Sequence, residues 1–214
     1  EGRPVWIEEA MDKDGEEPCA LGHTGCLYRE LFQHLRKDSL EAFAESALEA
    51  TVALIPGTVH AQIWEHSPTN RLLGLLAEYP KPSTKPEHFL LDVGVSIYCE
   101  SIMSKNVARF DPKALPAGRN WVLDDAQAAK ACGQVITVPV FNSCNSNQVQ
   151  LVLAFCVEKA DSEVSDGRLL DYADVIAIAY ETVLDELSLT ASCTVEQRLS
   201  RHSRYDDFIR AAVN

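Results

Sequence analysis

Apolar residues within positions 40–55 recur every three or four residues, the spacing that places them on one face of an α-helix. Asp38 stands where a helix cap is expected, and Glu41 follows three residues later, as in a capping box. A Pro-Gly pair at 56–57 then ends the periodic segment. Together with a shorter stripe of the same kind upstream, this pattern predicts helices over residues 38–55 and 27–35.

The apolar period changes to two after this helix, as is typical of a β-strand. One side of the alternating run consists of small or branched apolar residues, and the other side carries His60, Gln62 and Trp64. A polar turn and a second apolar run follow, so the segment reads as a β-hairpin with strands over 58–66 and 71–79. His60 and His66 are too far apart for one tight metal site, and surface positions are expected for both.

The last long pattern, over residues 166–187, alternates steps of four and three and forms a heptad seam. Such a seam can face either the core of the domain or a partner helix. The segment between the hairpin and this helix is expected to form a helix over 90–104, a strand over 107–110, a helix over 124–131, and strands over 134–141 and 149–157. After this helix, a final helix is expected from residue 194.

This order of elements predicts an α+β domain with a mainly antiparallel sheet and helices packed on it. The start of the chain differs from the rest, because seven acidic residues and few apolar ones precede residue 27. The predicted organisation is therefore an acidic, poorly ordered arm (1–26), a domain (27–190) and a C-terminal helix (191–214). The chain begins at Glu1 rather than at a methionine, which is typical of a piece of a longer protein.

Composition narrows the classes of function. The chain has 214 residues and a formal net charge of −13, which repels phosphate backbones and argues against a nucleic-acid partner. No apolar run approaches the roughly 18 residues of a membrane span, so no membrane partner is expected. The seven cysteines are odd in number and the chain is not small, so we expect reduced thiols and a cytoplasmic protein rather than a disulfide scaffold.

Several local phrases carry a resemblance to a known family. Residues 133–140 form a strand that ends in an apolar-Pro-apolar step, and a polar turn and the strand 149–157 follow. Residues 166–170 supply an acid and paired leucines, and 173–179 supply an alanine-rich helix face. In these phrases, and in the order of elements over 40–188, the chain resembles the GAF domain family of small-molecule-sensing modules.

The resemblance implies a GAF/PAS-like fold, in which a central antiparallel sheet carries helices on it and further helices at the termini. It also implies a regulatory or sensory domain in signal transduction, which binds a small ligand, forms a homodimer through its terminal helices, or does both. Two alternatives stay open. One is a degenerate domain of the same fold that serves only for assembly, and the other is a thiol-dependent enzyme resembling the methionine sulfoxide reductases of this family.

Members that bind cyclic nucleotides carry a signature near the last strand, and this chain matches it only in part. Lys159 and Asp166 match the residues whose ion pair pins the loop to the last helix. The signature's leading Asn is replaced by Glu158 and its closing Glu by Gly167, and no Phe stands between them. These departures count against a cyclic nucleotide and leave other ligands open.

In this fold, a ligand is expected between the sheet and the loops around residues 80–132. Aromatic side chains there can stack on a flat ligand, and an arginine can bind a carboxylate or phosphate. The candidate ligand-binding residues are Trp64, Ser96, Cys99, Phe110, Arg119, Trp121 and Thr137.

No catalytic residue, cofactor or metal site is assigned from the sequence. Cys19, His23 and Cys26 have the ligand types that suit zinc, but six residues separate the two thiols and no second pair stands near. The reductase alternative rests on Cys99 and Cys132, which flank the expected ligand site. Cys132 lies closer to the following strand than the recycling cysteine of that enzyme branch does, so this alternative ranks last.

Overall fold

The computed structural model describes residues 35, 38–81, 90–115, 117–118, 131–142, 145–158 and 164–190. The acidic arm, most of the helix expected over 27–35, most of that expected over 124–131, and the C-terminal helix (191–214) lie outside these residues. The described elements are α3 (Leu40–Leu54), β1 (Thr58–Ser67), β2 (Leu72–Tyr79), β3 (Leu90–Asp92), the 3₁₀ helix η1 (Val93–Val95), α4 (Tyr98–Ser104), β4 (Ala108–Phe110), β5 (Gln134–Asn142), β6 (Asn145–Val157) and α6 (Asp166–Thr190).

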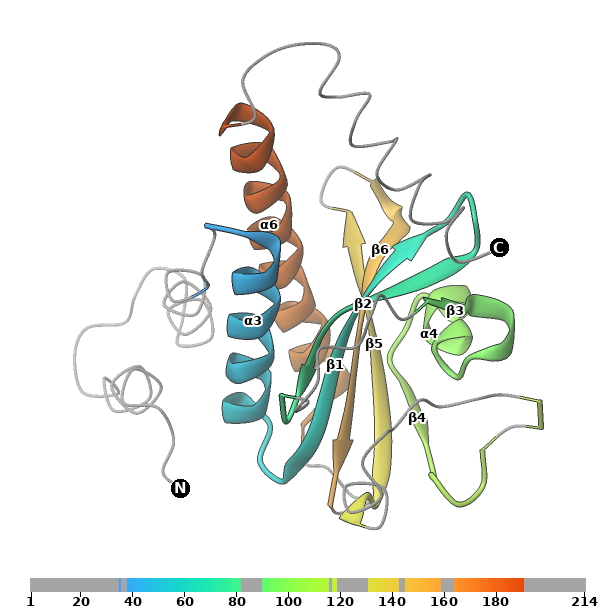
Figure 1. Cartoon of the computed structure of the whole chain (residues 1–214). Helices are drawn as coiled ribbons and strands as arrows, with labels where there is room; N and C mark the ends of the chain where they lie inside the picture. The colour runs from blue at the N-terminus through green and yellow to red at the C-terminus, as the bar shows by residue number, and fades with distance from the viewer. Residues whose placement is uncertain are drawn as a thin grey trace.

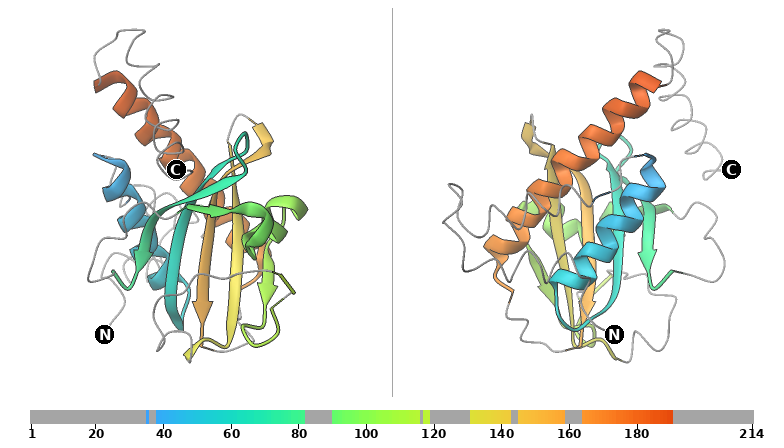
Figure 2. Two further views of the ribbon diagram at one scale, coloured as in Figure 1. Left: turned by 45° about the vertical axis from the view of Figure 1, so that its right-hand side comes forward. Right: turned by 90° about the vertical axis from the view of Figure 1, so that its left-hand side faces the viewer.

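The strands form one six-stranded sheet in the order β3-β2-β1-β6-β5-β4, and each neighbouring pair is antiparallel. Helices α3 and α6 lie side by side over one face of this sheet, whereas η1 and α4 lie on the opposite side (Figures 1 and 2). We call these two faces the α3/α6 face and the α4 face. The predicted α+β architecture with a central antiparallel sheet is confirmed.

Helix α3 forms where its apolar stripe predicted it, although its first residue is capped differently. The Ser39 side chain, rather than Asp38, accepts a hydrogen bond from the Ala42 backbone N–H at 3.0 Å. A serine in this position satisfies one of the backbone donors that a helix start leaves without a partner. The Pro-Gly pair ends the helix as expected, and Gly57 adopts a left-handed backbone with φ of 79°.

Helix α6 resolves the ambiguity of the heptad seam over most of its length. Its seam residues are almost fully buried and belong to the core cluster between α3, α6 and the sheet. The Tyr172 hydroxyl, which lies beside this seam, shares a hydrogen bond of 2.8 Å with Thr51 of α3. The seam therefore packs within this chain, through Leu169, Ala173, Ile176, Tyr180 and Val183.

Strand β1 is buried on both faces, because helices cover the sheet on one side and α4 packs on β5 and β6 on the other. Ala61 and Ile63 belong to the α3/α6 core, and Trp64 belongs to the cluster of the α4 face. The expected surface position of His60 is wrong, since only 3% of this residue is exposed. Because both faces of β1 are covered, its polar residues have no access to solvent and must be paired instead.

The segment expected as one helix over 90–104 divides into three elements. Residues Leu90–Asp92 pair with β2 as the edge strand β3, and the Val93 backbone N–H donates to the Arg71 carbonyl. The Asp92 carboxylate accepts a hydrogen bond from the Gly94 backbone at 2.6 Å and begins η1. Only residues from Tyr98 onward form α4. Pairing with β2 and the low helix propensity of Gly94 explain why the helix starts late.

None of the described helices combines the length and the apolar character needed to cross a membrane.

Candidate functional site

The α4 face is organised as rows of residues that lie opposite one another across the strands. A polar and small-residue row runs from β2 to β4 through Glu78, Gln62, Ala154, Thr137 and Ala108. The rows on either side of it carry larger side chains. One contains His60, Cys156, Val135 and Phe110, and the other contains Leu75, Trp64, Val152 and Pro139.

Thr137 lies between Ala154 and Ala108 in this row and is fully buried. Its two neighbours in the row, Ala154 and Ala108, have side chains that extend less far from the sheet than Trp64 or Phe110 in the adjacent rows. Within the described part of the chain, the Thr137 hydroxyl oxygen has no hydrogen-bond partner. Burying an unpaired hydroxyl costs free energy, so this atom is poised to accept or donate one further hydrogen bond.

Gln62 is the hub of a buried hydrogen-bond network in the same row. Its side-chain oxygen accepts from the Tyr98 hydroxyl at 2.8 Å and from the Trp64 indole N–H at 3.1 Å. Its side-chain nitrogen donates to Glu78 Oε1 at 3.0 Å. Tyr98 belongs to α4, so the network fixes α4 onto the sheet and orients the aromatic residues there.

The Glu78 carboxylate also bonds to His60, whose Nε2 lies 2.7 Å from Glu78 Oε1. Burial raises the pKa of Glu78, but hydrogen bonds from His60 and Gln62 and the nearby imidazole outweigh burial, so the net pKa lies below 4.5. Glu78 is therefore held as a carboxylate, and its hydrogen bonds with His60 and Gln62 both fall on Oε1.

Aromatic rings close the α4 side of the network. The rings of Trp64 and Tyr98 are tilted against each other with centroids 5.2 Å apart. Full burial raises the pKa of Tyr98, which keeps its hydroxyl protonated and able to donate to Gln62.

Nearby Ser96 is also fully buried, and its hydroxyl donates to the Val93 carbonyl at 3.0 Å, an internal bond that holds η1.

Two of the three cysteines in the described part of the chain depart from the expectation of reduced thiols. Cys132, which directly precedes β5, forms a disulfide with Cys156 of β6, and their Cα atoms are 5.6 Å apart. Cys99 is a buried free cysteine of the same hydrophobic cluster. Cys156 faces the α4 side because it lies two residues beyond Ala154 on the same strand. Sequence spacing alone did not indicate this pair, because two strands bring together residues that are 24 positions apart.

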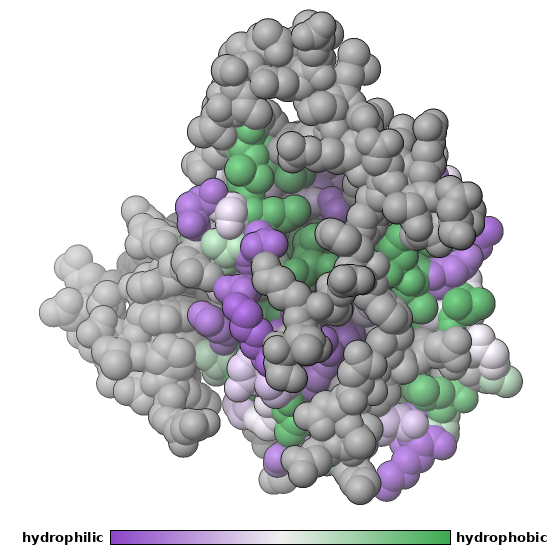
Figure 3. All heavy atoms as spheres, viewed as in Figure 1, coloured by the Kyte–Doolittle hydropathy of each residue, from purple (hydrophilic) through white to green (hydrophobic). Residues whose placement is uncertain are grey.

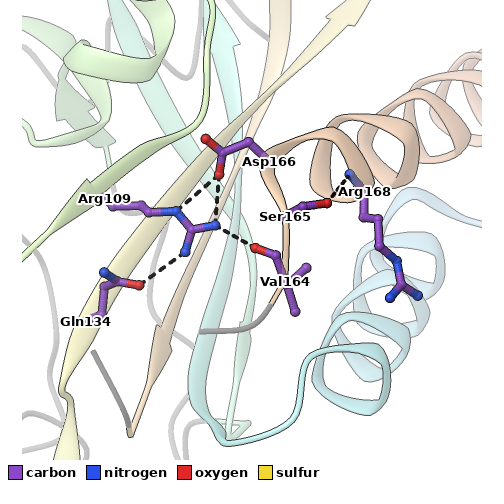
Figure 4. Close-up of polar contacts among 6 residues, drawn as sticks. All are labelled: Arg109, Gln134, Val164, Ser165, Asp166 and Arg168. Atoms are coloured by element: carbon purple, nitrogen blue, oxygen red, sulfur yellow. Dashed lines mark hydrogen bonds and ion pairs between the residues drawn. The ribbon is translucent and has the colours of Figure 1, made fainter. Parts of the chain in front are cut away.

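Arg109 of β4 makes the second polar cluster, at the start of α6 (Figure 4). Its guanidinium donates to Asp166 Oδ1 from Nε at 3.1 Å and from Nη2 at 2.8 Å. It also donates to the Val164 carbonyl at 2.7 Å and to the Gln134 side chain at 3.2 Å. Asp166 therefore has an ion-pair partner in Arg109, while its expected partner Lys159 lies outside the described residues.

The structure brings most of the sequence-derived candidates to one face. Trp64 and Cys99 belong to the cluster of the α4 face, Phe110 packs against it, and Thr137 lies in its central row. Ser96 is close in sequence but has its hydroxyl engaged within η1. The remaining candidates, Arg119 and Trp121, lie outside the described residues.

Four functional candidates were missed from the sequence: Gln62, Glu78, Tyr98 and Arg109. The alternation that placed Gln62 on the same strand face as Trp64 was a usable signal for the first of them. Glu78 and Tyr98 reach Gln62, and Arg109 reaches Asp166, only through strand register and helix packing, which the sequence did not indicate.

Among the described residues, no cluster of histidine, cysteine or acidic side chains has the arrangement of a metal site. Hydrophobic side chains form several patches on the side where β3, η1 and α4 lie (Figure 3), and Val95 and Met103 are large exposed hydrophobic residues there.

Comparison with solved structures gives the same architecture in proteins of low sequence identity. The GAF domain of a phosphoenolpyruvate-protein phosphotransferase from Coxiella burnetii superposes with a TM-score of 0.61 at 10% identity, over 77% of this chain and 96% of that one. The corresponding domain from Acinetobacter gives 0.57 at 12% identity, over 75% and 94%. Free methionine-R-sulfoxide reductase from Neisseria meningitidis, in complex with its substrate, gives 0.54 at 15% identity, over 79% and 97%.

No protein-family model matches the sequence, and no curated protein is significantly similar to it. The likeness is therefore one of fold.

Proposed function

We propose that this chain, a GAF-like domain, is a regulatory domain that binds a small molecule on the α4 face of its sheet. The observation that carries the proposal is the buried Thr137 hydroxyl, which has no partner among the described residues. It lies between two alanines, in a row flanked by larger side chains. A ligand with one hydrogen-bonding group above Thr137 would satisfy this hydroxyl and offset its desolvation.

The surroundings of Thr137 favour a ligand with little net charge. The carboxylate of Glu78 is already paired with His60 and Gln62, and the oxygen of Gln62 is taken by Tyr98 and Trp64. These groups build a wall whose polar atoms are already hydrogen-bonded to one another. The proposed ligand therefore makes apolar contacts with the larger flanking residues and one hydrogen bond to Thr137.

The route from this face to the end of the domain passes through Arg109. Arg109 lies on β4 between Ala108 and Phe110, which belong to the rows of the α4 face. The Arg109 side chain holds the first turn of α6 through Asp166. A ligand that shifts β4 changes this attachment, so binding would bias the position of α6. To transmit a signal, a domain must make different contacts with its ligand in its two conformational states.

The cheapest test is thermal unfolding of the full chain with a panel of cyclic nucleotides, amino acids and tetrapyrroles. Any ligand that binds the folded chain raises its melting temperature in proportion to the logarithm of its concentration. A concentration-dependent rise with one class supports the proposal. Silence across the panel at millimolar concentrations favours an assembly role instead.

The assembly role has one observation of its own. Ile178 of α6 is 51% exposed on the side of the helix away from its buried seam. We propose a second copy of this chain as its partner, through the outward side of α6. Sedimentation of the chain at micromolar concentration tests this: a dimer that Ile178→Glu dissociates supports it, and a monomer contradicts it.

The reductase alternative has weaker support. The Neisseria enzyme shares the fold at 15% identity. The cysteines that motivated the alternative are not paired with each other, because Cys132 is bonded to Cys156 while Cys99 is free. We therefore do not carry sulfoxide reduction forward.

A further inference from the structure

The disulfide of the α4 face lies beside a paired imidazole. Cys156 on β6 has His60 directly opposite it on β1, and opposite side chains of antiparallel strands have Cβ atoms about 5 Å apart. His60 is itself held by Glu78, through Nε2 at 2.7 Å. Sulfur, imidazole and carboxylate thus follow one another across β6, β1 and β2. We infer that Cys132–Cys156 is a reversible site of thiol–disulfide exchange, with low-molecular-weight dithiols and disulfides as its reagents.

His60 is placed to serve as the acid–base group of the exchange. Glu78 engages Nε2, which leaves Nδ1 as the ring nitrogen that can pass a proton to or from sulfur. A carboxylate that holds one nitrogen of an imidazole fixes the orientation of the ring. The thiolate of Cys156 is then formed next to a group that can protonate it, which is the requirement for a good leaving sulfur.

The reaction balances with a dithiol as the only co-reactant. One reagent thiolate attacks the sulfur of Cys132, a mixed disulfide forms, and the bond to Cys156 breaks. Cys156 leaves as a thiolate and takes its proton from His60. The second reagent thiol loses its proton to solvent and attacks the mixed disulfide, and Cys132 leaves as a thiolate. Cys132 and the His60 ring then each take a proton from solvent, so the reagent ends as a disulfide and the protein as two thiols. Two electrons and two protons pass to the protein, and the reverse reaction returns them.

Both oxidation states fit the same backbone. In the reduced state, the Cys132 thiol has an acceptor already in reach, since its sulfur lies 3.5 Å from the Gln134 carbonyl oxygen. The Cys156 thiol has His60 opposite it. The strand pairing around Cys156 is independent of the disulfide, because the Gly133 N–H donates to the Val157 carbonyl at 2.8 Å. A pair whose members are satisfied in both states can cycle without unfolding the sheet.

Burial selects the size of the reagent. Cys132 is 4% exposed and Cys156 is fully buried, so the surface of a redox protein cannot approach either sulfur. A small dithiol needs only a local opening next to Cys132. Thiol–disulfide exchange is a property beyond the proposed ligand binding and does not depend on it, because the oxidation state of the two sulfurs is measured without a bound ligand.

The test equilibrates the folded full chain with reduced and oxidised dithiothreitol in varied ratios, followed by alkylation and peptide mass mapping. We expect Cys132 and Cys156 to change together, while circular dichroism reports an unchanged fold. We also expect His60→Gln to slow reduction at pH 7 about a hundredfold, the lower range for a positioned acid–base group. His66→Gln is the matched control, because His66 bonds to the Val149 carbonyl at the other end of β1, and its rate should equal wild type.

Three results would overturn the inference. The first is that the Cys132–Cys156 disulfide does not form under fully oxidised dithiothreitol. The second is that it is reduced only at urea concentrations that unfold the chain. The third is that the disulfide of His60→Gln is reduced as fast as that of wild type. If His60→Gln fails to fold, Glu78→Gln gives the same reading, because it removes the carboxylate that holds the imidazole. Cys99→Ser should leave the exchange unchanged, since Cys99 lies outside the disulfide.

Discussion

Arg109 donates two hydrogen bonds to a single carboxylate oxygen of Asp166, although 57 residues separate them in the sequence. The contact joins the edge strand β4 to the first turn of α6, where a negative charge is also favourable to the helix dipole. The Ser165 hydroxyl accepts a hydrogen bond from the Arg168 backbone in the same turn (Figure 4). The start of α6 is thus fixed both by its own cap and by a residue from the edge strand β4.

Removing this contact should loosen α6 without unfolding the domain. Because the Arg109 and Asp166 side chains are 26% and 57% exposed, solvent screens the pair, and Arg109→Ala should cost only about 1 kcal/mol of unfolding free energy. Amide hydrogen exchange of the first turn of α6 should rise clearly. Lys81→Ala is the matched control, because it removes an exposed ion pair with Glu45 that does not touch α6. Unchanged exchange in α6 after Arg109→Ala would rule out the link.

The network around Gln62 should be the most sensitive polar element of the α4 face. Gln62→Leu leaves the buried donors of Tyr98 and Trp64 without an acceptor, and unsatisfied buried groups cost about 1–3 kcal/mol each. We expect a loss of about 3 kcal/mol, measured by urea denaturation. Gln148→Leu, at an exposed position of β6, should change stability by less than about 0.5 kcal/mol. Equal effects of the two substitutions would show that the network contributes nothing.

Glu78 gives a pH dependence whose sign follows from its lowered pKa. A carboxyl whose pKa is lower in the folded state contributes stability above its unfolded value, and this contribution disappears as the pH falls through the folded value. The difference in unfolding free energy between wild type and Glu78→Gln should therefore be steady from pH 7 to 5.5 and should narrow below the ordinary value of 4.5. A difference that stays constant down to pH 3 would contradict the assigned shift.

Thr137 should be a destabilising residue in the ligand-free chain. Thr137→Val keeps the shape of the side chain and removes the buried hydroxyl, so it should raise the unfolding free energy by about 1 kcal/mol. Thr137→Ser keeps the hydroxyl and loses a methyl group, so it should be less stable than wild type by about 1 kcal/mol. If the Val variant is instead destabilised, the hydroxyl makes a bond that the account does not include.

The periodic segments of the sequence predicted the frame of the fold well. The helical stripe of α3, the hairpin of β1 and β2, the paired strands β5 and β6 and the seam of α6 all formed near their predicted bounds. In each of these segments the buried residues recur at a regular spacing, and this spacing along the sequence determines whether a helix or a strand forms. The segment after residue 89 failed, because pairing of Leu91 with Leu73 on β2 overrode a helical pattern.

The site was predictable only where it depended on strand alternation. Alternation along the strand correctly placed Trp64 on the same face as His60 and Gln62, and Thr137 of β5 lies on that face as well. His60 was misjudged as a surface residue because the sequence does not show that Glu78 lies within 2.7 Å of it. The Cys132–Cys156 bond likewise depends on the register of β5 and β6 and on the turn before them. Pairings between distant residues come from topology, which periodicity does not encode.

The most direct test of ligand binding on the α4 face is the dissociation constant of the compound that gives the largest thermal shift, measured by calorimetry for three chains. We expect Thr137→Ser to bind within about threefold of wild type and Thr137→Val to bind about tenfold more weakly, the effect of one lost hydrogen bond. Equal affinity for wild type and Thr137→Val, or no binding by any compound of the panel, would contradict this expectation.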